Sequence, residues 1–431
     1  MPETNPQESD AVLGGQNPPP INAAILGGLA GAKQRLESES IVAKIQALKD
    51  TIQYGTDGIN LALEALADPN DDVKRFARRL LRDRAGEAGK AALLDREPLS
   101  YFTTLADWRW EIYNPEIGIV DPENNAYVVQ MTDSWEYSDR YDSFLGHFES
   151  LLKDPKIGEL KALIVKIEQE FIFTEEDPFA KALAAICDAG NLFANLRGLY
   201  IGDSKEEWPT GYRRSKLSVS DIRPFLESFP TLEILQVFGR FTDDEYQDEG
   251  YTSLNCAGLR HENLKTLIIE TAHLAGENLN QIGRIELPSL EYFELWLGKI
   301  DIFRYRIAKA LKPILFDNAS PNLKYLGLCS DNDTDSLIIE VLTSPIIDRL
   351  AVLDFKMGTM TLKGAEYLLN SPDLRNLKYL NVFGNYLSES TIAKLQELPC
   401  QINSDSPPYP AHEGGNWDRR CEGHRRWALH E

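Results

Sequence analysis

An uneven rhythm of apolar residues recurs along the second half of the chain. In the stretch LKYLNVFGNYL, residues 377 to 387, the apolar positions Leu377, Leu380 and Val382 follow one another at intervals of three and two. Strict alternation would indicate a plain strand, and intervals of three and four would indicate a helix. This pattern predicts a short strand with alternate residues pointing inward, entered by an inward residue three positions earlier. Asn385 follows at a turn, where its amide can satisfy buried backbone groups.

The same pattern occurs eight times, with successive first positions 36, 36, 32, 26, 33, 27 and 27 residues apart. Stretches with apolar positions three or four apart, such as DIRPFLESFP and LKGAEYLLNSP, lie between the copies and predict helices. Alternating strands and helices stack into a curved solenoid, with a parallel sheet on the concave face and helices outside. The eight copies begin at Leu160, Leu196, Leu232, Leu264, Leu290, Leu323, Leu350 and Leu377.

With these motifs, residues 155–400 resemble leucine-rich-repeat proteins of the ribonuclease-inhibitor-like type. The resemblance implies an α/β fold class and a leucine-rich-repeat solenoid. It does not imply an activity, because one fold serves many functions.

An all-helical module is predicted before the solenoid, over residues 29–98. Apolar positions at helical spacing end at the Asp68-Pro69 turn and resume with Val73, Ala77 and Leu81. These residues resemble a HEAT repeat, although only one to two repeats are covered and an independent solenoid needs three or more. The preceding segment contains AVLGG at residues 11–15 and AILGG at residues 24–28. Together with the helical segment it is similar to the opening of multidomain cyanobacterial proteins, which implies a shared adaptor.

The remaining segments have no repeat pattern. Residues 1–28 are rich in Pro, Gly and polar side chains and are expected to form a flexible tail. Residues 99–154 are expected to form an N-terminal cap containing a hairpin of two strands around the turn DPENN. Residues 401–431 are expected to form a C-terminal tail.

Large aromatic and acidic residues occupy the outward positions of the predicted strands, where they would line the concave face. Exposed Trp and Tyr residues often carry most of the energy of a protein interface, so we expect a partner to bind here. Two alternatives stay open: the aromatics pack on one another across neighbouring strands, or a terminal segment covers them. The candidate partner-binding residues are Tyr200, Phe238, Glu270, Tyr292, Glu294, Trp296, Tyr325, Asp354, Tyr379 and Phe383.

Composition narrows the class of partner. The formal net charge of −22 would repel a phosphate backbone, so we expect no nucleic-acid partner and a basic protein is the more compatible one. No apolar run reaches the roughly 20 residues needed to span a bilayer, so no membrane association is expected. The five cysteines are odd in number and scattered along the chain, which favours the cytoplasm.

Candidate chemistry is sparse. We find no nucleophile elbow, phosphate-binding loop, zinc-protease motif or dinucleotide fingerprint, so we expect neither catalysis nor a cofactor. Asp331, Asp333 and Asp335 have the spacing of a calcium loop, but the cage is incomplete and a solvated loop is expected. The C-terminal tail offers a possible zinc site, without paired ligand motifs, and four arginines at which a partner enzyme could recognise or cut the chain. These residues are Cys421, His424 and His430, and Arg419, Arg420, Arg425 and Arg426.

The sequence therefore predicts a non-catalytic scaffold that binds a protein on the concave face of the solenoid. The alternative function is that of a substrate or carrier, whose N- or C-terminal segment is processed or recognised by an enzyme such as a protease.

Overall fold

The computed structural model describes residues 28–130, 137–167, 178–203, 217, 219–239, 253–271, 274–298, 307–385 and 387–404. The chain divides into two compact units, of which the first ends at Tyr101 and the second begins at Phe102.

The first unit is helical throughout its described part. Helix α4 begins where Asn70 caps it, because the Asn70 side chain accepts hydrogen bonds from the backbone N–H groups of Asp72 and Val73. Val73, Ala77 and Leu81 are buried in the core of this unit, as their spacing predicts. The helices are α1 (Gly28–Leu36), α2 (Ile41–Thr51), α3 (Gly55–Glu64), α4 (Asp71–Asp83) and α5 (Gly86–Arg96).

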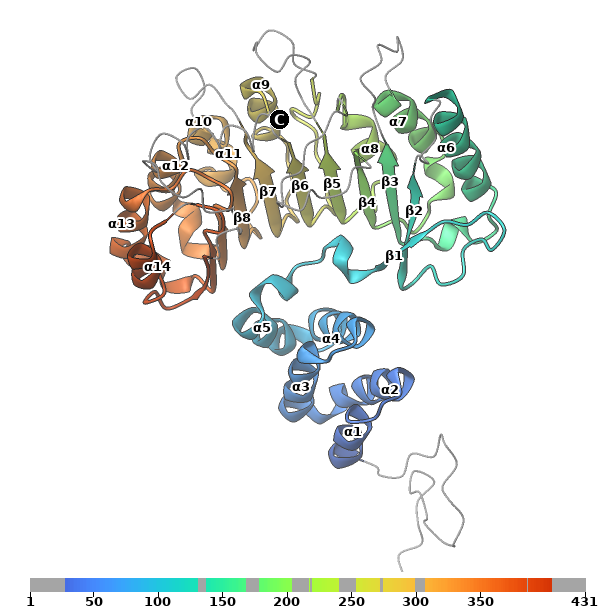
Figure 1. Cartoon of the computed structure of the whole chain (residues 1–431), viewed down its shortest axis with the longest axis horizontal. Helices are drawn as coiled ribbons and strands as arrows, with labels where there is room; N and C mark the ends of the chain where they lie inside the picture. The colour runs from blue at the N-terminus through green and yellow to red at the C-terminus, as the bar shows by residue number, and fades with distance from the viewer. Residues whose placement is uncertain are drawn as a thin grey trace, which may run out of the picture. The chain divides into compact units, whose positions relative to one another are not determined.

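The second unit is an α/β repeat solenoid, which confirms the predicted fold class. In the described part of the chain, eleven strands form one parallel sheet, each pairing with its neighbours in chain order. The sheet follows an arc (Figure 1). The strands are β1 (Arg109–Ile112), β2 (Asn125–Gln130), β3 (Ala162–Ile167), β4 (Gly198–Asp203), β5 (Ile234–Phe238), β6 (Thr266–Glu270), β7 (Tyr292–Trp296), β8 (Tyr325–Cys329), β9 (Val352–Asp354), β10 (Tyr379–Asn381) and β11 (Gln401–Asn403).

Helices lie along the outer side of this arc (Figure 1). They pack against the inner side chains of the sheet and close one continuous hydrophobic core. The helices are α6 (Tyr137–Leu152), α7 (Pro178–Asp188), α8 (Arg223–Ser228), α9 (Gly276–Ile282), α10 (Ile307–Ala310), α11 (Lys312–Leu315), α12 (Thr334–Leu342), α13 (Leu362–Asn370) and α14 (Glu389–Leu395).

The strand register aligns the eight repeats as the leucine pattern predicts. The second apolar position of every copy pairs with that of the next, and all eight side chains are buried in the core. This inner row consists of Leu163, Leu199, Leu235, Leu267, Phe293, Leu326, Leu353 and Leu380.

Asn385 satisfies buried backbone at the turn after β10, as expected. Its side-chain carbonyl accepts a hydrogen bond from the Met360 N–H at 2.9 Å. Its amide donates to the carbonyls of Phe355 at 2.6 Å and Val382 at 3.2 Å. The side chain therefore joins two neighbouring turns.

The predicted hairpin in the cap is wrong. Strands β1 and β2 pair in parallel, with Arg109 opposite Asn125, so they extend the solenoid sheet at its N-terminal end. At the other end β11 continues the sheet beyond residue 400. The segment between the first two strands crosses over instead of turning back, because parallel partners need a crossover connection.

Candidate functional site

The concave face of the sheet carries a buried network of polar side chains on β7, β8 and the turn after β9. The Lys356 ammonium lies 2.8 Å from Glu294 Oε1 and 3.2 Å from Asp354 Oδ2. In the register of the sheet, Gly327 stands between Glu294 and Asp354. A Cβ atom at Gly327 would come within 3.0 Å of Glu294 Cγ, so glycine leaves the room that this cluster needs.

Aromatic side chains complete the network. The Tyr292 hydroxyl donates to Glu294 Oε2 at 2.5 Å, and the Trp296 indole donates to Glu294 Oε1 at 2.8 Å. The Tyr325 hydroxyl lies 2.6 Å from Asp354 Oδ2 and 3.1 Å from Glu294 Oε2. The rings of Tyr292 and Tyr325 stack with centroids 3.7 Å apart. The sequence-predicted residues on these strands therefore form one cluster.

The protonation of this cluster follows from burial and from the Lys356 charge. Burial alone would raise the pKa of Glu294, but the charge and hydrogen bond of Lys356 bring it below its ordinary value. Burial would lower the pKa of Lys356, yet Glu294 and the other nearby groups raise it well above its ordinary value. Burial raises the pKa of Asp354, with the Glu294 charge acting in the same direction and Lys356 opposing it in part. Lys356 is thus a cation held between two buried carboxyl groups.

A segment from outside the eight predicted repeats lies across this face. We name Phe102–Trp108 the concave strap; it leads into β1 (Figure 1). The Phe102 ring meets the rings of Tyr292 and Tyr325 edge-on, with centroids 5.4 and 5.6 Å apart. Further along, Leu105 and Trp108 pack in a second cluster with side chains of β2 to β5. The strap therefore crosses the sheet from β8 towards β1.

The strap changes the exposure expected of the candidate residues. Tyr325 is only 2% exposed, and five of the ten are buried: Tyr200, Phe238, Glu294, Tyr325 and Asp354. The other five are half-buried: Glu270, Tyr292, Trp296, Tyr379 and Phe383. Their expected exposure is therefore wrong for half of the set, because packing across strands and the strap remove those side chains from water.

Sequence reasoning missed the anchors of the strap. The sequence did contain one indication of these anchors. Three large apolar residues, Phe102, Leu105 and Trp108, are spaced at intervals of three in a segment that lacks the repeat pattern. Lys356 was also missed, because a lysine in an outward position looks like an ordinary solvated side chain until the two carboxyl groups beside it are placed.

Other sequence-predicted sites stand as follows. Asp331 is wholly buried, and Asp335 accepts hydrogen bonds from the backbone N–H groups of Thr361 and Gly364, so this segment is not the solvated loop expected. Within the described ranges no cluster of His, Cys, Asp or Glu could hold a metal ion. The C-terminal candidates Cys421, His424, His430, Arg419, Arg420, Arg425 and Arg426, and both glycine-rich repeats apart from Gly28, lie outside the described residues.

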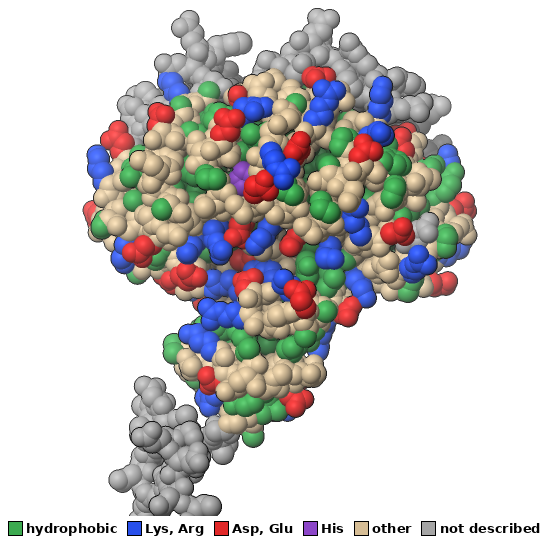
Figure 2. Space-filling model, turned by 180° about the vertical axis from the view of Figure 1, so that it is seen from behind, with side chains coloured by type: hydrophobic (Ala, Val, Ile, Leu, Met, Phe, Trp, Pro, Cys, Tyr) green, Lys and Arg blue, Asp and Glu red, His purple; other side chains and the backbone are tan. Residues whose placement is uncertain are grey.

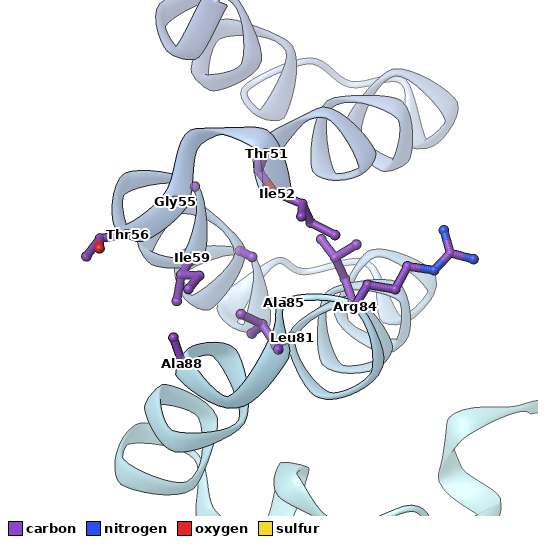
Figure 3. A pocket seen from close by; sticks show the side chains of 13 residues that line it. Thr51, Ile52, Gly55, Thr56, Ile59, Leu81, Arg84, Ala85 and Ala88 are labelled. Atoms are coloured by element: carbon purple, nitrogen blue, oxygen red, sulfur yellow. The ribbon is translucent and has the colours of Figure 1, made fainter.

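A cavity of about 390 Å³ opens in the first unit. Ile59, Leu81 and Ala88 point towards one another there from α3, α4 and α5 (Figure 3). Arg84 is its single charged lining residue among those described. The lining is too apolar for acid–base chemistry, and the structure shows no group that occupies it.

Figure 2 shows acidic and basic side chains interspersed over the face turned to the viewer. None of the described helices is both long enough and apolar enough to cross a membrane.

Comparison with known proteins supports the fold and does not give a function. No protein-family model and no curated protein match the chain. A crystal structure of a Bacteroides fragilis protein, solved as a structural-genomics target, is similar, with a TM-score of 0.52 and 26% sequence identity. The match covers 65% of this chain and 75% of that one.

Proposed function

We propose that the chain is a leucine-rich-repeat protein of the ribonuclease-inhibitor-like type, with a HEAT-like helical module, and that it acts as a non-catalytic scaffold in the cytoplasm. Its solenoid binds a protein partner on the concave face. The observation that carries the proposal is a row of half-buried side chains towards the C-terminal end of that face, namely Trp296, Lys356 and Phe383.

The chemistry of this row suits recognition of a protein. Trp296 and Phe383 offer apolar area without being wholly buried, and aromatic side chains with large contact area are enriched at interface hot spots. Lys356 lies 5.4 Å from the centre of the Trp296 ring, which fixes the ring by a cation–π contact. A pre-ordered aromatic side chain loses less conformational entropy when a partner binds.

The pKa values of three groups in the concave network, Tyr325, Cys329 and Lys356, do not suit catalysis at neutral pH. A nucleophile or general base needs a pKa close to the working pH. Burial raises the pKa of the Tyr325 hydroxyl and the Cys329 thiol well above their ordinary values. Lys356 likewise keeps its proton. These groups are inert at neutral pH and act as a support for the face.

Charge favours a basic partner. Residues 102–431 hold 52 of the 67 acidic side chains but only 33 of the 45 basic ones. Such an excess raises the local concentration and the association rate of a partner of opposite sign. Binding that depends on this excess should weaken as salt is added.

The test compares proteins captured from the native host by three tagged chains. They are the parent, a double variant with Trp296→Ala and Phe383→Ala, and a control with Tyr367→Ala, which removes an exposed ring from the outer helix α13. We expect one protein to be retained by the parent and the control and lost by the double variant, with affinity for the purified partner at least tenfold weaker. Equal capture by all three chains would show that the concave row does not bind it.

A further inference from the structure

The concave strap occupies its face through three anchors at regular intervals. Phe102, Leu105 and Trp108 are each buried, whereas Ala106 between them is exposed. A short turn over Leu105–Asp107 keeps this spacing, because the Thr104 N–H donates to the Asp107 carboxylate at 3.3 Å. The strap thus presents its three apolar anchors to the sheet and Ala106 to solvent.

Each anchor packs against particular residues of the sheet, which we call its seat. The stacked pair Tyr292 and Tyr325 receives the Phe102 ring. Gly198 provides space for Leu105, since a Cβ atom there would lie 2.8 Å from Leu105 Cδ2.

Trp108 packs in the cluster that contains Tyr200, Ile234 and Phe238. Between the first two seats, the Thr266 hydroxyl donates to the Thr103 carbonyl at 2.5 Å. This is the arrangement by which a groove receives an extended peptide: pockets for spaced side chains and a polar contact to the peptide backbone.

The strap is not a strand of the described sheet. It crosses the strands and pairs with none of them until β1 begins at Arg109. The Trp108 indole N–H is buried and finds no acceptor among the described atoms. A buried donor without a partner costs about 1–3 kcal/mol, which offsets part of the gain from burying the ring. The strap can therefore leave its seats without breaking the hydrogen-bond ladder of the sheet.

We propose that the concave face is a peptide-recognition site, and that the strap fills its seats from within until an external ligand displaces it. The ligand is an extended protein segment with an aromatic residue, an aliphatic residue and a second aromatic residue at intervals of three. This inference rests on the proposed scaffold function and names its partner class. The strap competes as a tethered ligand, whose effective concentration is in the millimolar range for a short connection, so a free segment binds the parent chain more weakly than a chain with a weakened strap.

The test uses a fluorescein-labelled peptide of residues 101–112 and the full chain in two forms. One is the parent, and the other carries Phe102→Ala, Leu105→Ala and Trp108→Ala. By fluorescence anisotropy we expect saturable binding to the triple variant and at least tenfold weaker binding to the parent. The same peptide with its three anchors replaced by Ala should bind neither. Equal binding to both chains, or no saturable binding to a triple variant that keeps the parent's circular dichroism, overturns the proposal.

A second variant covers the case in which the triple variant does not fold. Gly198→Val leaves the strap sequence intact, places a β-branched residue suited to a strand, and pushes Leu105 from its seat. In hydrogen exchange we expect residues 102–108 to lose protection while β4 to β6 keep theirs. Loss of protection from strap and sheet together would show that the strap is a fixed part of the core, and would overturn the proposal.

The two proposals fail separately. Peptide binding without a partner that depends on Trp296 and Phe383 would overturn only the position of the proposed partner site. Capture of such a partner without peptide binding would overturn only the displaceable strap.

Discussion

The two faces of the solenoid sheet are kept from water in different ways. On the inner face, each leucine of the inner row contacts its equivalents in the neighbouring repeats and the helices that follow them. On the concave face, Tyr200, Phe238 and Tyr325 are buried under a strap that precedes the repeats in sequence. The inner face is thus held by contacts between neighbours, and the concave face by a contact between distant segments.

This difference explains which parts of the molecule respond to a partner. A side chain of the inner row can be exposed only if repeats separate, which requires breaking the sheet. A side chain under the strap is exposed when a single segment leaves. Local opening of this kind costs less free energy than global unfolding. A partner can therefore bind the concave face without unfolding the repeats.

The largest effect is expected on the inner face. Phe293→Ala removes a wholly buried ring from β7, and large-to-small changes of this kind cost about 3–5 kcal/mol because a cavity remains. Chemical denaturation should show this loss. The matched control, Phe316→Ala, removes a ring that is 39% exposed and should change stability by less than about 1 kcal/mol. Equal losses would remove the distinction between the inner row and the surface.

Next in size is the loss of the cation of the concave network. Lys356→Met leaves the buried carboxyl groups of Glu294 and Asp354 without a positive charge, which costs about 3 kcal/mol. Without that charge burial raises the pKa of both groups in the folded state, so their protonated forms are favoured. The loss of stability should therefore be larger at pH 8 than at pH 5.

The control for this variant is Lys265→Met. Lys265 pairs with Glu233 at 3.0 Å, but its side chain is well exposed, so its removal should cost less than about 1 kcal/mol at either pH. A Lys356 variant that behaves like this control would show that the concave network does not stabilise the fold.

The same difference decides what the sequence predicts. The spacing of Leu377, Leu380 and Val382 predicts strand, register and inner row, because each contact repeats from one copy to the next. Nothing in the pattern links Thr103 to Thr266, which lie 163 positions apart. The pairing of β1 with β2 also escaped prediction, because the expected hairpin placed its first strand directly before the turn DPENN, whereas β1 ends at Ile112. Contacts between distant segments depend on the assembled fold, so they set the exposure of the candidate site.

A smaller effect on stability is expected just after β8, where a single carboxyl group, that of Asp331, is buried. Burial raises the pKa of the Asp331 carboxyl to about 7, with neighbouring acidic groups acting in the same direction. The folded state binds this proton more tightly than the unfolded state does, so protonation of Asp331 stabilises the fold at low pH. This stabilisation is lost as the pH rises from about 4 to 7. Its Oδ1 atom forms no hydrogen bond with any of the described residues.

Asp331→Asn should abolish the loss of stability that accompanies deprotonation of Asp331. At pH 8 we expect the variant to be more stable by on the order of 2 kcal/mol, since the gain of about 1.4 kcal/mol per pKa unit is partly offset by burying an unpaired amide. Unfolding should be followed from pH 4 to 8, with Asp317→Asn at an exposed position as the control. An unchanged pH slope in the Asp331 variant would show that this carboxyl group does not titrate in that range.

The smallest change tests the comparison most directly. Thr266→Val keeps the shape and strand preference of the buried side chain but removes the hydroxyl that donates to the Thr103 carbonyl. The loss of one such hydrogen bond costs about 1 kcal/mol, and all of it should fall on the strap. Hydrogen exchange of residues 102–108 should therefore quicken while that of β6 and its neighbours stays the same. Thr231→Val removes a hydroxyl bonded to the Leu196 carbonyl within the repeats and should leave the strap unchanged. If Thr266→Val quickens exchange in strap and sheet alike, the two open as one unit, and the concave face is held as firmly as the inner one.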